Sequence, residues 1–308
     1  MLGLKVPFFV VVTKIDMAAA ENRNATIDAL KKLLKKSKTP LLVKDERDVM
    51  TSVQNVAGGV ITPIFQVSCV TGEGLDLVRA FLNHLPSRRS FAPLAGNEAL
   101  VHLDDSFAVP GIGTVVAGLV VSGTIETKDE LLLGPNGNGE FVPVAVKSSM
   151  NKRVPVDRVA CGSSGSWALK ARKTGTHVHK DDVRKGMILC AASLNPRACW
   201  QFQAEVILSH PTTLKVGYAP ILHCLTVRQC ARIVRMEGKD VLRMGDRALV
   251  TFEWNHRPEY VKVGTRVIFR EGRTKGVGVV RATLPDVPRA PPVNYKSARQ
   301  ARQPPRGW

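Results

Sequence analysis

The chain has 308 residues, which is enough for two or three domains with buried cores. Apolar residues make up 44% and charged residues 23%, a globular composition that excludes disorder over the whole chain. The 44 Lys and Arg outnumber the 26 Asp and Glu, and the formal net charge of +18 favours a polyanionic partner. The alternative is a basic surface that only keeps the protein in solution.

Targeting and metal-binding patterns are absent from the sequence. The apolar run Val6–Val12 is shorter than the ~20 residues that cross a bilayer, and it lacks a signal-peptide cleavage site, so we expect no membrane association. None of the six cysteines forms a C-x-x-C pair, and scattered cysteines are typical of thiols kept reduced in the cytosol. We therefore expect a cytoplasmic protein without a zinc site, and we interpret His177 and His179 as loop residues.

Residues 1–88 alternate between strand and helix patterns. Val6–Val12 and Pro63–Val67 are short β-rich apolar runs, typical of strands buried on both faces of a parallel sheet. Apolar residues at helical spacing predict helices over Asn24–Ser37 and Gly74–Leu85. This order predicts an α/β domain with a parallel sheet, although the strands are too few for a complete doubly wound domain.

From residue 89 onward, short β-rich runs separated by glycine turns replace the helical pattern. The stretch Gly134–Gly139 predicts a hairpin turn between two strands. Two successive groups of about six short strands predict closed β-barrels over residues 89–192 and 193–284. Residues 285–308 contain six prolines and five basic residues against one acid, which predicts a disordered basic tail.

Two segments that follow the predicted strands of the α/β part carry the most informative chemistry. In Thr13-Lys14-Ile15-Asp16, a carboxylate at a strand end can accept hydrogen bonds from N1 and N2 of guanine, a donor pair that adenine lacks. The alkyl part of Lys14 can lie along a purine ring. The alternative for Asp16 is a helix cap.

The second segment is Ser68-Cys69-Val70-Thr71-Gly72, where a backbone N–H can donate to guanine O6. The two segments lie about 50 residues apart, each directly after a predicted strand. Together they predict a guanine site. Its expected residues are Thr13, Lys14, Asp16, Ser68, Cys69 and Val70.

These segments resemble known motifs. Thr13–Asp16 resembles the N/T-K-x-D guanine motif of translational GTPases, and Ser68–Leu75 resembles their S-A-x loop. Phe107–Gly118 is similar to the opening hairpin of the second domain of elongation factor Tu, and Arg270–Val279 to the closing strands of its third domain. The GTP-binding protein 1 and 2 group is most similar, through Leu131–Pro135, Val144–Ser148, Arg184–Met187, Leu194–Pro196, His210–Thr213 and Pro258–Tyr260.

The resemblance covers roughly residues 3–284 and implies part of a P-loop GTPase domain followed by translation-factor domains II and III. The sequence contains no G-x-x-x-x-G-K-[ST], and the superfamily's phosphate loop, Mg²⁺ ligands and water-positioning histidine would precede Thr13. We therefore expect an N-terminally truncated chain without catalytic residues or metal ligands. GTP or GDP is the implied ligand, and Mg²⁺ is expected only in the intact protein. GTP hydrolysis is implied by the resemblance, but we expect the 308 residues alone to be inactive.

The resemblance also implies that the barrels contact transfer RNA, the ribosome or another structured RNA. Residues 197–284 hold 15 Lys and Arg against 7 Asp and Glu, which suits phosphate contacts. Arg273, Thr274 and Lys275 are the expected RNA-contacting residues. Two alternatives stay open: an RNA-binding barrel module without enzymatic activity, and a relative that carries initiator or specialised transfer RNA.

Overall fold

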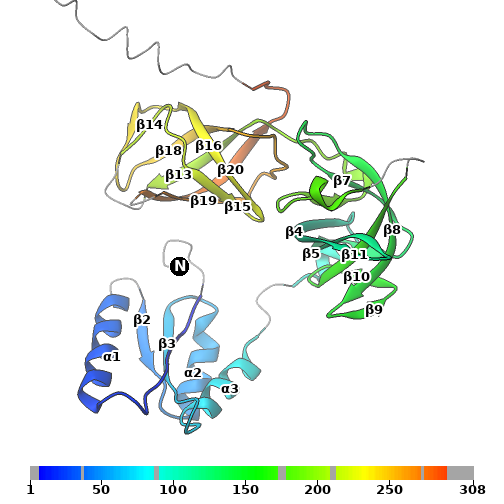
Figure 1. Ribbon diagram of the computed structural model, residues 1–308. Coiled ribbons are helices and arrows are strands. Elements are labelled where there is room, and N and C mark those ends of the chain that lie inside the picture. Colours follow the sequence, from blue (N-terminus) through cyan, green and yellow to red (C-terminus); the bar gives the residue numbers. More distant parts are fainter. Residues whose placement is uncertain are drawn as a thin grey trace, which may run out of the picture. The chain divides into compact units, whose positions relative to one another are not determined.

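The structure is a computed structural model that describes residues 7–35, 38–86, 90–172, 178–208, 213–271 and 274–289. The chain divides into two compact units, Met1–Ser90 and Phe91–Trp308 (Figure 1). The first unit is built of strands and helices, and the second contains two β-barrels, as the sequence predicts. Across the described ranges, no helix combines the length and the apolar character that crossing a membrane requires.

The first unit has a three-stranded parallel sheet in the order β1-β3-β2. The middle strand carries the most buried side chains, because it has a neighbour on both edges: Ile64 and Phe65 are at most 1% exposed. The elements in chain order are β1 (Val10–Val12), α1 (Ala20–Leu34), β2 (Thr39–Leu42), α2 (Glu46–Val56), β3 (Ile61–Gln66) and α3 (Leu75–His84).

The sequence patterns identified β1, α1, β3 and α3 but not β2 and α2. Strand β1 is shorter than the apolar run, and it begins at Val10, three residues after Pro7. Strand β2 contains Pro40 and lies at the edge of the sheet, the position that tolerates a residue without an N–H. Helix α2 buries Val49, Ser52, Val53 and Val56, which recur at helical spacing, and the sequence analysis overlooked this pattern. The helix starts because the Asp45 side chain accepts the backbone N–H of Asp48 at 2.9 Å.

The first barrel, barrel II, closes because β11 pairs with both β5 and β8. Its core includes Val101, Val116 and Trp167, which are completely buried. The sequence patterns missed β4 and the three-residue strands β6, β9 and β10. In β4, a register shift between Leu103 and Asp105 interrupts the alternation of apolar and polar residues. Its strands are β4 (Leu100–Val109), β5 (Gly113–Ser122), β6 (Thr124–Glu126), β7 (Glu130–Gly134), β8 (Val142–Asn151), β9 (Val154–Val156), β10 (Arg158–Ala160), β11 (Ser164–Ala171) and β12 (Ile188–Cys190).

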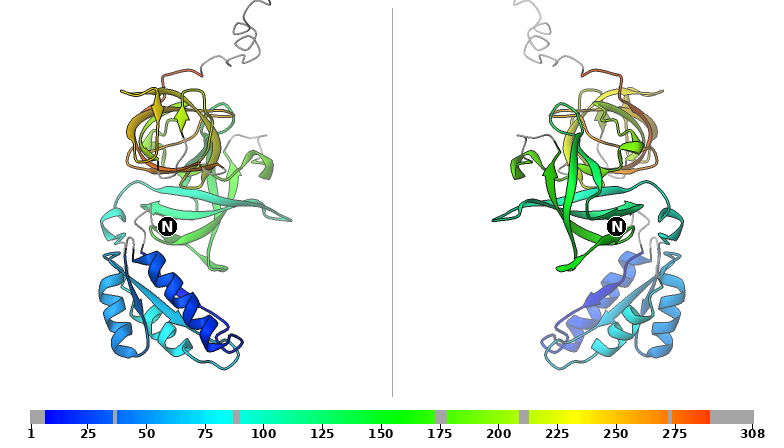
Figure 2. Two further views of the ribbon diagram at one scale, coloured as in Figure 1. Left: turned by 90° about the vertical axis from the view of Figure 1, so that its left-hand side faces the viewer. Right: turned by 90° about the vertical axis from the view of Figure 1, so that its right-hand side faces the viewer.

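The second barrel, barrel III, is closed in the order β13-β18-β16-β15-β19-β20, and Figure 2 shows it as a ring of yellow to red strands. Phe202 and Phe252 stack in its core, with ring centroids 5.5 Å apart. Its strands are β13 (Gln201–Leu208), β14 (Leu214–Lys215), β15 (Ile221–Cys224), β16 (Val227–Met236), β17 (Val241–Leu242), β18 (Arg247–Trp254), β19 (Arg266–Glu271) and β20 (Thr274–Leu284).

A buried ion pair joins the two barrels. Arg184, from the turn before β12, donates to Glu259, which follows β18, with Nη1 and Oε2 2.9 Å apart. The other carboxylate oxygen of Glu259 accepts from Gln229 at 2.8 Å, and Arg184 also donates to the carbonyl of Pro135 at 3.3 Å. The Glu259 side chain is 2% exposed. Burial raises the pKa of the Glu259 carboxyl and lowers the pKa of the Arg184 guanidinium, so each charge depends on the other.

His102 of β4 makes the stability of the barrels depend on pH. Burial, assisted by the positive charge of Lys262, lowers the pKa of His102 from 6.5 to about 4. Between pH 6.5 and 4 the unfolded chain binds a proton at His102 that the folded chain does not bind. The free energy of unfolding should therefore fall by up to about 3 kcal/mol across this window, through this residue alone.

Urea unfolding of the parent and of His102→Gln at pH 7 and at pH 4.5 measures this contribution. The variant should lose less stability than the parent on acidification, because glutamine does not titrate. Equal losses in the two proteins would contradict the expectation.

Candidate functional site

The pairing of β1 with β3 brings the two predicted guanine segments to one edge of the sheet. The strands run parallel with Val12 opposite Gln66, so Thr13 and Val67 leave the sheet side by side. The backbone N–H of Val67 donates to the carbonyl of Val12 at 2.9 Å, and that of Ile15 donates to the carbonyl of Val67 at 3.4 Å. Main-chain hydrogen bonds thus hold the segments together without the help of exposed side chains.

The first segment turns sharply at this edge. Lys14 has a φ of 60°, in the left-handed region that residues with a Cβ rarely adopt, while Ile15 is buried at 5% exposure. The buried isoleucine anchors the turn, and Thr13, Lys14 and Asp16 are exposed. A non-glycine residue in this conformation is more frequent at functional sites than elsewhere.

Asp16 does not cap a helix. Helix α1 begins four residues later, with Ala19 at the N-cap and no side-chain cap. In the described part of the chain, no hydrogen bond or ion pair engages the Asp16 carboxylate. The alternative role of Asp16 as a helix cap is therefore wrong. Its carboxylate is available to a ligand.

The second segment is a tight loop organised by Ser68, which is completely buried. Its Oγ accepts the backbone N–H groups of Val70 at 3.2 Å and Thr71 at 3.1 Å. Its carbonyl accepts from Gly72, and its N–H donates to Glu73, both at 3.0 Å. Ser68 thus shapes the loop from inside.

Cys69 and Val70 project from this loop, and Val70 is 84% exposed. The loop therefore presents its apex to solvent at the same edge of the sheet as Asp16. A loop fixed from inside and open at its apex suits the binding of a ligand by backbone groups.

Gly74 ends the loop and starts α3. It has a φ of 73°, and a Cβ at this position would lie 2.0 Å from the carbonyl oxygen of Gln66. No other residue fits here without moving the backbone. The motif Ser68–Leu75 includes Gly74, but the sequence analysis gave this glycine no role, although the Gly72-x-Gly74 spacing is a turn signal.

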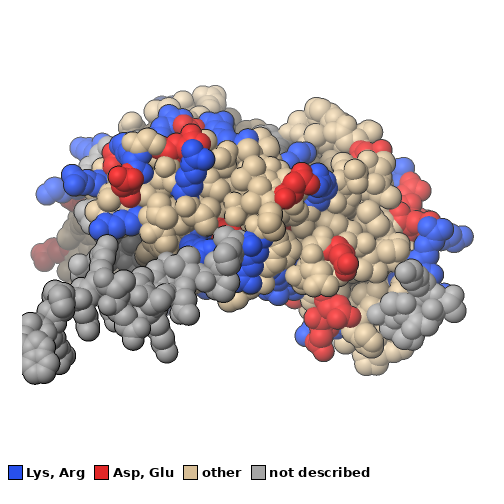
Figure 3. Space-filling model, turned by 90° about the horizontal axis from the view of Figure 1, so that it is seen from above, with Lys and Arg blue, Asp and Glu red and all other residues tan. Residues whose placement is uncertain are grey.

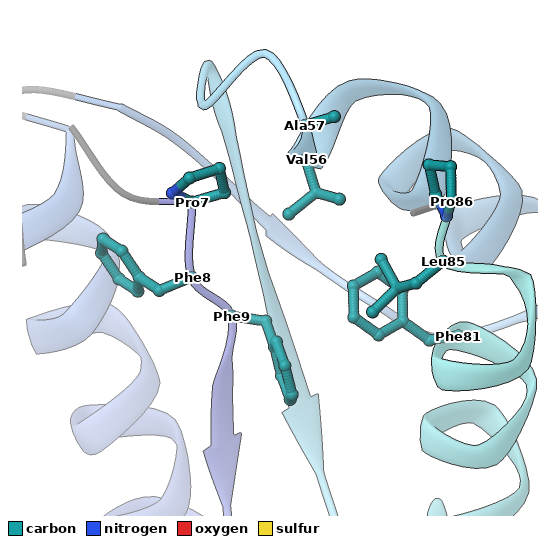
Figure 4. Close-up of a pocket in the computed structure, with 8 residues that line it drawn as sticks. All are labelled: Pro7, Phe8, Phe9, Val56, Ala57, Phe81, Leu85 and Pro86. Atoms are coloured by element: carbon teal, nitrogen blue, oxygen red, sulfur yellow. The ribbon is translucent and has the colours of Figure 1, made fainter. Parts of the chain in front are cut away.

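A separate apolar pocket of about 210 Å³ lies at the opposite end of β1, and it contains none of the predicted site residues (Figure 4). Phe9 and Phe81 in its lining pack edge to face, with ring centroids 5.2 Å apart. Its lining offers few polar groups for a base or a phosphate. The complete lining is Pro7, Phe8, Phe9, Val56, Ala57, Phe81, Leu85 and Pro86.

The expected RNA-contacting residues are only partly covered by the structure. Arg273 lies outside the described residues, and Thr274 and Lys275 are described only as the start of β20. Elsewhere on barrel III, ion pairs neutralise part of the basic surplus, as when Arg247 and Arg281 both contact Glu205. Figure 3 accordingly shows Lys and Arg in separate groups, several of them beside Asp or Glu.

The sequence and the fold both have known relatives. The chain is 43% identical over 305 residues to GTP-binding protein 1 of Xenopus laevis, covering 98% of this chain and 45% of that protein. It is 38% identical over 287 residues to human GTP-binding protein 2, covering 91% of this chain and 47% of that protein. The structure of translation elongation factor SelB from Methanococcus maripaludis in its apo form matches 92% of this chain and 60% of that one, with a TM-score of 0.68 and 19% identity. No family model matches the chain.

These relatives establish the class of protein. The chain belongs to the translational GTPase superfamily, as its motifs indicated, and an α/β unit followed by two barrels is the fold that this superfamily predicts. Within the superfamily it is similar to GTP-binding proteins 1 and 2, and it spans somewhat less than half the length of these two relatives.

Proposed function

We propose that the edge formed by Thr13–Asp16 and Ser68–Val70 binds the guanine base of GTP or GDP. The observation that carries this proposal is the pair of main-chain hydrogen bonds between the segments, beside a carboxylate without a partner in the described chain. Asp16 would accept the N1 and N2 hydrogens of guanine, and the stem of Lys14 would lie along the ring. Thr13 would support the turn that presents them.

The loop geometry supports a particular backbone N–H as the donor for guanine O6. The N–H groups of Val70 and Thr71 are engaged by Ser68 Oγ, and that of Gly72 by the Ser68 carbonyl. The N–H of Cys69 has no such partner among the described residues, so it is the loop amide left for the ligand. Ser68 is then a positioning residue, because it holds this amide outward without touching the base.

Phosphate and metal binding need groups beyond this edge. Among the described residues, no three His, Cys, Asp or Glu side chains come together. Hydrolysis of GTP by the intact protein would depend on charges placed around the β- and γ-phosphates. In that protein, GTP hydrolysis would be coupled to the binding of transfer RNA or the ribosome by the two barrels.

Ligand-observed NMR on the 308-residue chain tests the base site. Saturation transfer to guanosine and GDP should exceed transfer to adenosine and ADP, because adenine cannot supply two donors to Asp16. In the same samples, Mg²⁺-dependent phosphate release from GTP should stay at background. Equal transfer to both bases would contradict the site, and clear turnover would contradict the assignment of catalysis to other residues.

Thiol labelling locates the bound base. Burial raises the pKa of Cys190, Cys199 and Cys224 to about 12, so these thiols should react slowly, whereas Cys69 is exposed. GDP should slow the alkylation of Cys69 more than that of the half-buried Cys161, measured by peptide mass spectrometry. Cys161, which lies in barrel II, serves as the internal control.

A further inference from the structure

The hairpin between β8 and β9 ends in a strained basic turn. Asn151 pairs with Val154, so Lys152 and Arg153 form a two-residue connection between the strands. Their φ angles are 51° and 68°. Positive φ at both central positions defines a type I′ turn, which strongly favours Asn-Gly because most side chains destabilise it.

The sequence therefore keeps two long basic side chains at positions where Asn and Gly would give a more stable turn. Strain of this kind persists where the side chains have another use. Lys152 and Arg153 do not serve packing, since both are exposed. No hydrogen bond or ion pair in the described chain engages either side chain.

The electrostatic setting distinguishes this hairpin from the basic positions on the barrels that pair with acids. No acid occurs between Phe141 and Val156, so Lys152 and Arg153 are not neutralised along the hairpin. Arg172 and Arg247, in contrast, pair with Glu130 and Glu205. Figure 1 shows β9 at the margin of barrel II, where the turn can approach a large partner.

We propose that this turn binds the phosphate backbone of a structured RNA. The inference rests on the RNA-binding part of the proposed function. It places an RNA contact on barrel II, away from the edge formed by Thr13–Asp16 and Ser68–Val70. Arg can hold a phosphate through two parallel hydrogen bonds, and Lys adds a point charge beside it. A two-residue tip is too small for a stable protein interface, which needs about 800 Å² from each partner, whereas a phosphate contact needs only the donors.

A double variant separates this role from a structural one. Lys152→Asn with Arg153→Gly removes both charges and installs the preferred turn residues, so the barrels should melt at least about 3 °C higher. The same variant should bind a labelled transfer RNA transcript about tenfold more weakly at low salt. Its plot of log affinity against log salt should be shallower by about one to two units, as expected for the loss of two phosphate contacts.

Two control variants accompany the measurement. Lys152→Arg with Arg153→Lys keeps both charges and should retain the affinity and slope of the parent within about twofold. Lys32→Gln with Lys35→Gln removes two exposed charges from α1 and its end, and should change the slope much less than the hairpin variant. Fluorescence anisotropy with transfer RNA, and with an unrelated RNA hairpin, gives the affinities.

The outcomes separate this inference from the proposed function. Unchanged affinity and slope in the Asn-Gly variant, with RNA binding by the parent intact, would overturn the inference alone. An equal loss in the α1 control would show a general charge effect and would also overturn it. Loss of binding to an acidic protein or to anionic vesicles, with RNA binding unchanged, would assign the turn to another partner. If the parent protein does not bind RNA, both the proposed RNA function and this site are wrong. The guanosine measurements test the base site independently.

Discussion

Glu259→Leu is expected to destabilise the barrel pair by about 3–5 kcal/mol, because it leaves the Arg184 guanidinium, which is 16% exposed, without its carboxylate. The substitution also removes the acceptor of Gln229 and the carboxylate 3.7 Å from Arg257. Unpaired buried charges and donors cost more than the net gain of the intact pair. Chemical unfolding followed by tryptophan fluorescence measures the loss, since Trp167 and Trp254 are completely buried, one in each barrel.

An exposed ion pair in barrel II provides the matched control. Arg172 and Glu130 are 59% and 55% exposed, so Arg172→Leu should cost less than about 1 kcal/mol. The double variant Arg184→Met with Glu259→Leu should recover much of the loss, because it leaves neither charge buried alone. If Glu259→Leu costs no more than the exposed control, the ion pair between the barrels does not contribute to their stability.

The meeting of the two segments at the edge proposed to bind guanine was predictable from the sequence. Two short motifs each follow a predicted strand, and parallel strands place their carboxyl ends at one edge of a sheet. The register that sets Val12 opposite Gln66 came only from the structure. The internal construction of the loop was not predictable. The burial of Ser68 and the left-handed backbone of Lys14 depend on hydrogen bonds that form only after the strands have paired.

The contacts between the barrels were beyond sequence reasoning. The motif Arg184–Met187 and the motif Pro258–Tyr260 were both recognised, but nothing in either one pairs Arg184 with Glu259 across 75 positions. The type I′ turn at Lys152-Arg153 could not be predicted from the sequence for a different reason. Lys152-Arg153 has no sequence signature of a type I′ turn, because the usual Asn-Gly signal is missing.

The expected nucleotide preference of Asp16→Asn follows from the proposed contact between this carboxylate and guanine. The amide side chain can accept only one of the two hydrogens of guanine N1 and N2 and carries no charge. Each charge-assisted hydrogen bond is worth about 1.5–3 kcal/mol, so affinity for guanosine should fall at least about tenfold. Xanthine has a carbonyl where guanine has its amino group, and the amide introduced by the substitution would donate to that carbonyl. Xanthosine should therefore replace guanosine as the preferred ligand.

Two controls show whether the effect of Asp16→Asn is specific to base binding. Because Ala19 and not Asp16 occupies the N-cap of α1, the substitution should leave the melting temperature of the first unit unchanged. Asp28→Asn makes the same chemical change at an exposed position of α1 and should alter neither stability nor the order of guanosine over xanthosine. Ligand-observed NMR with both nucleosides measures the preference. An Asp16→Asn protein that still prefers guanosine, with the affinity of the parent, would mean that this carboxylate does not contact the base.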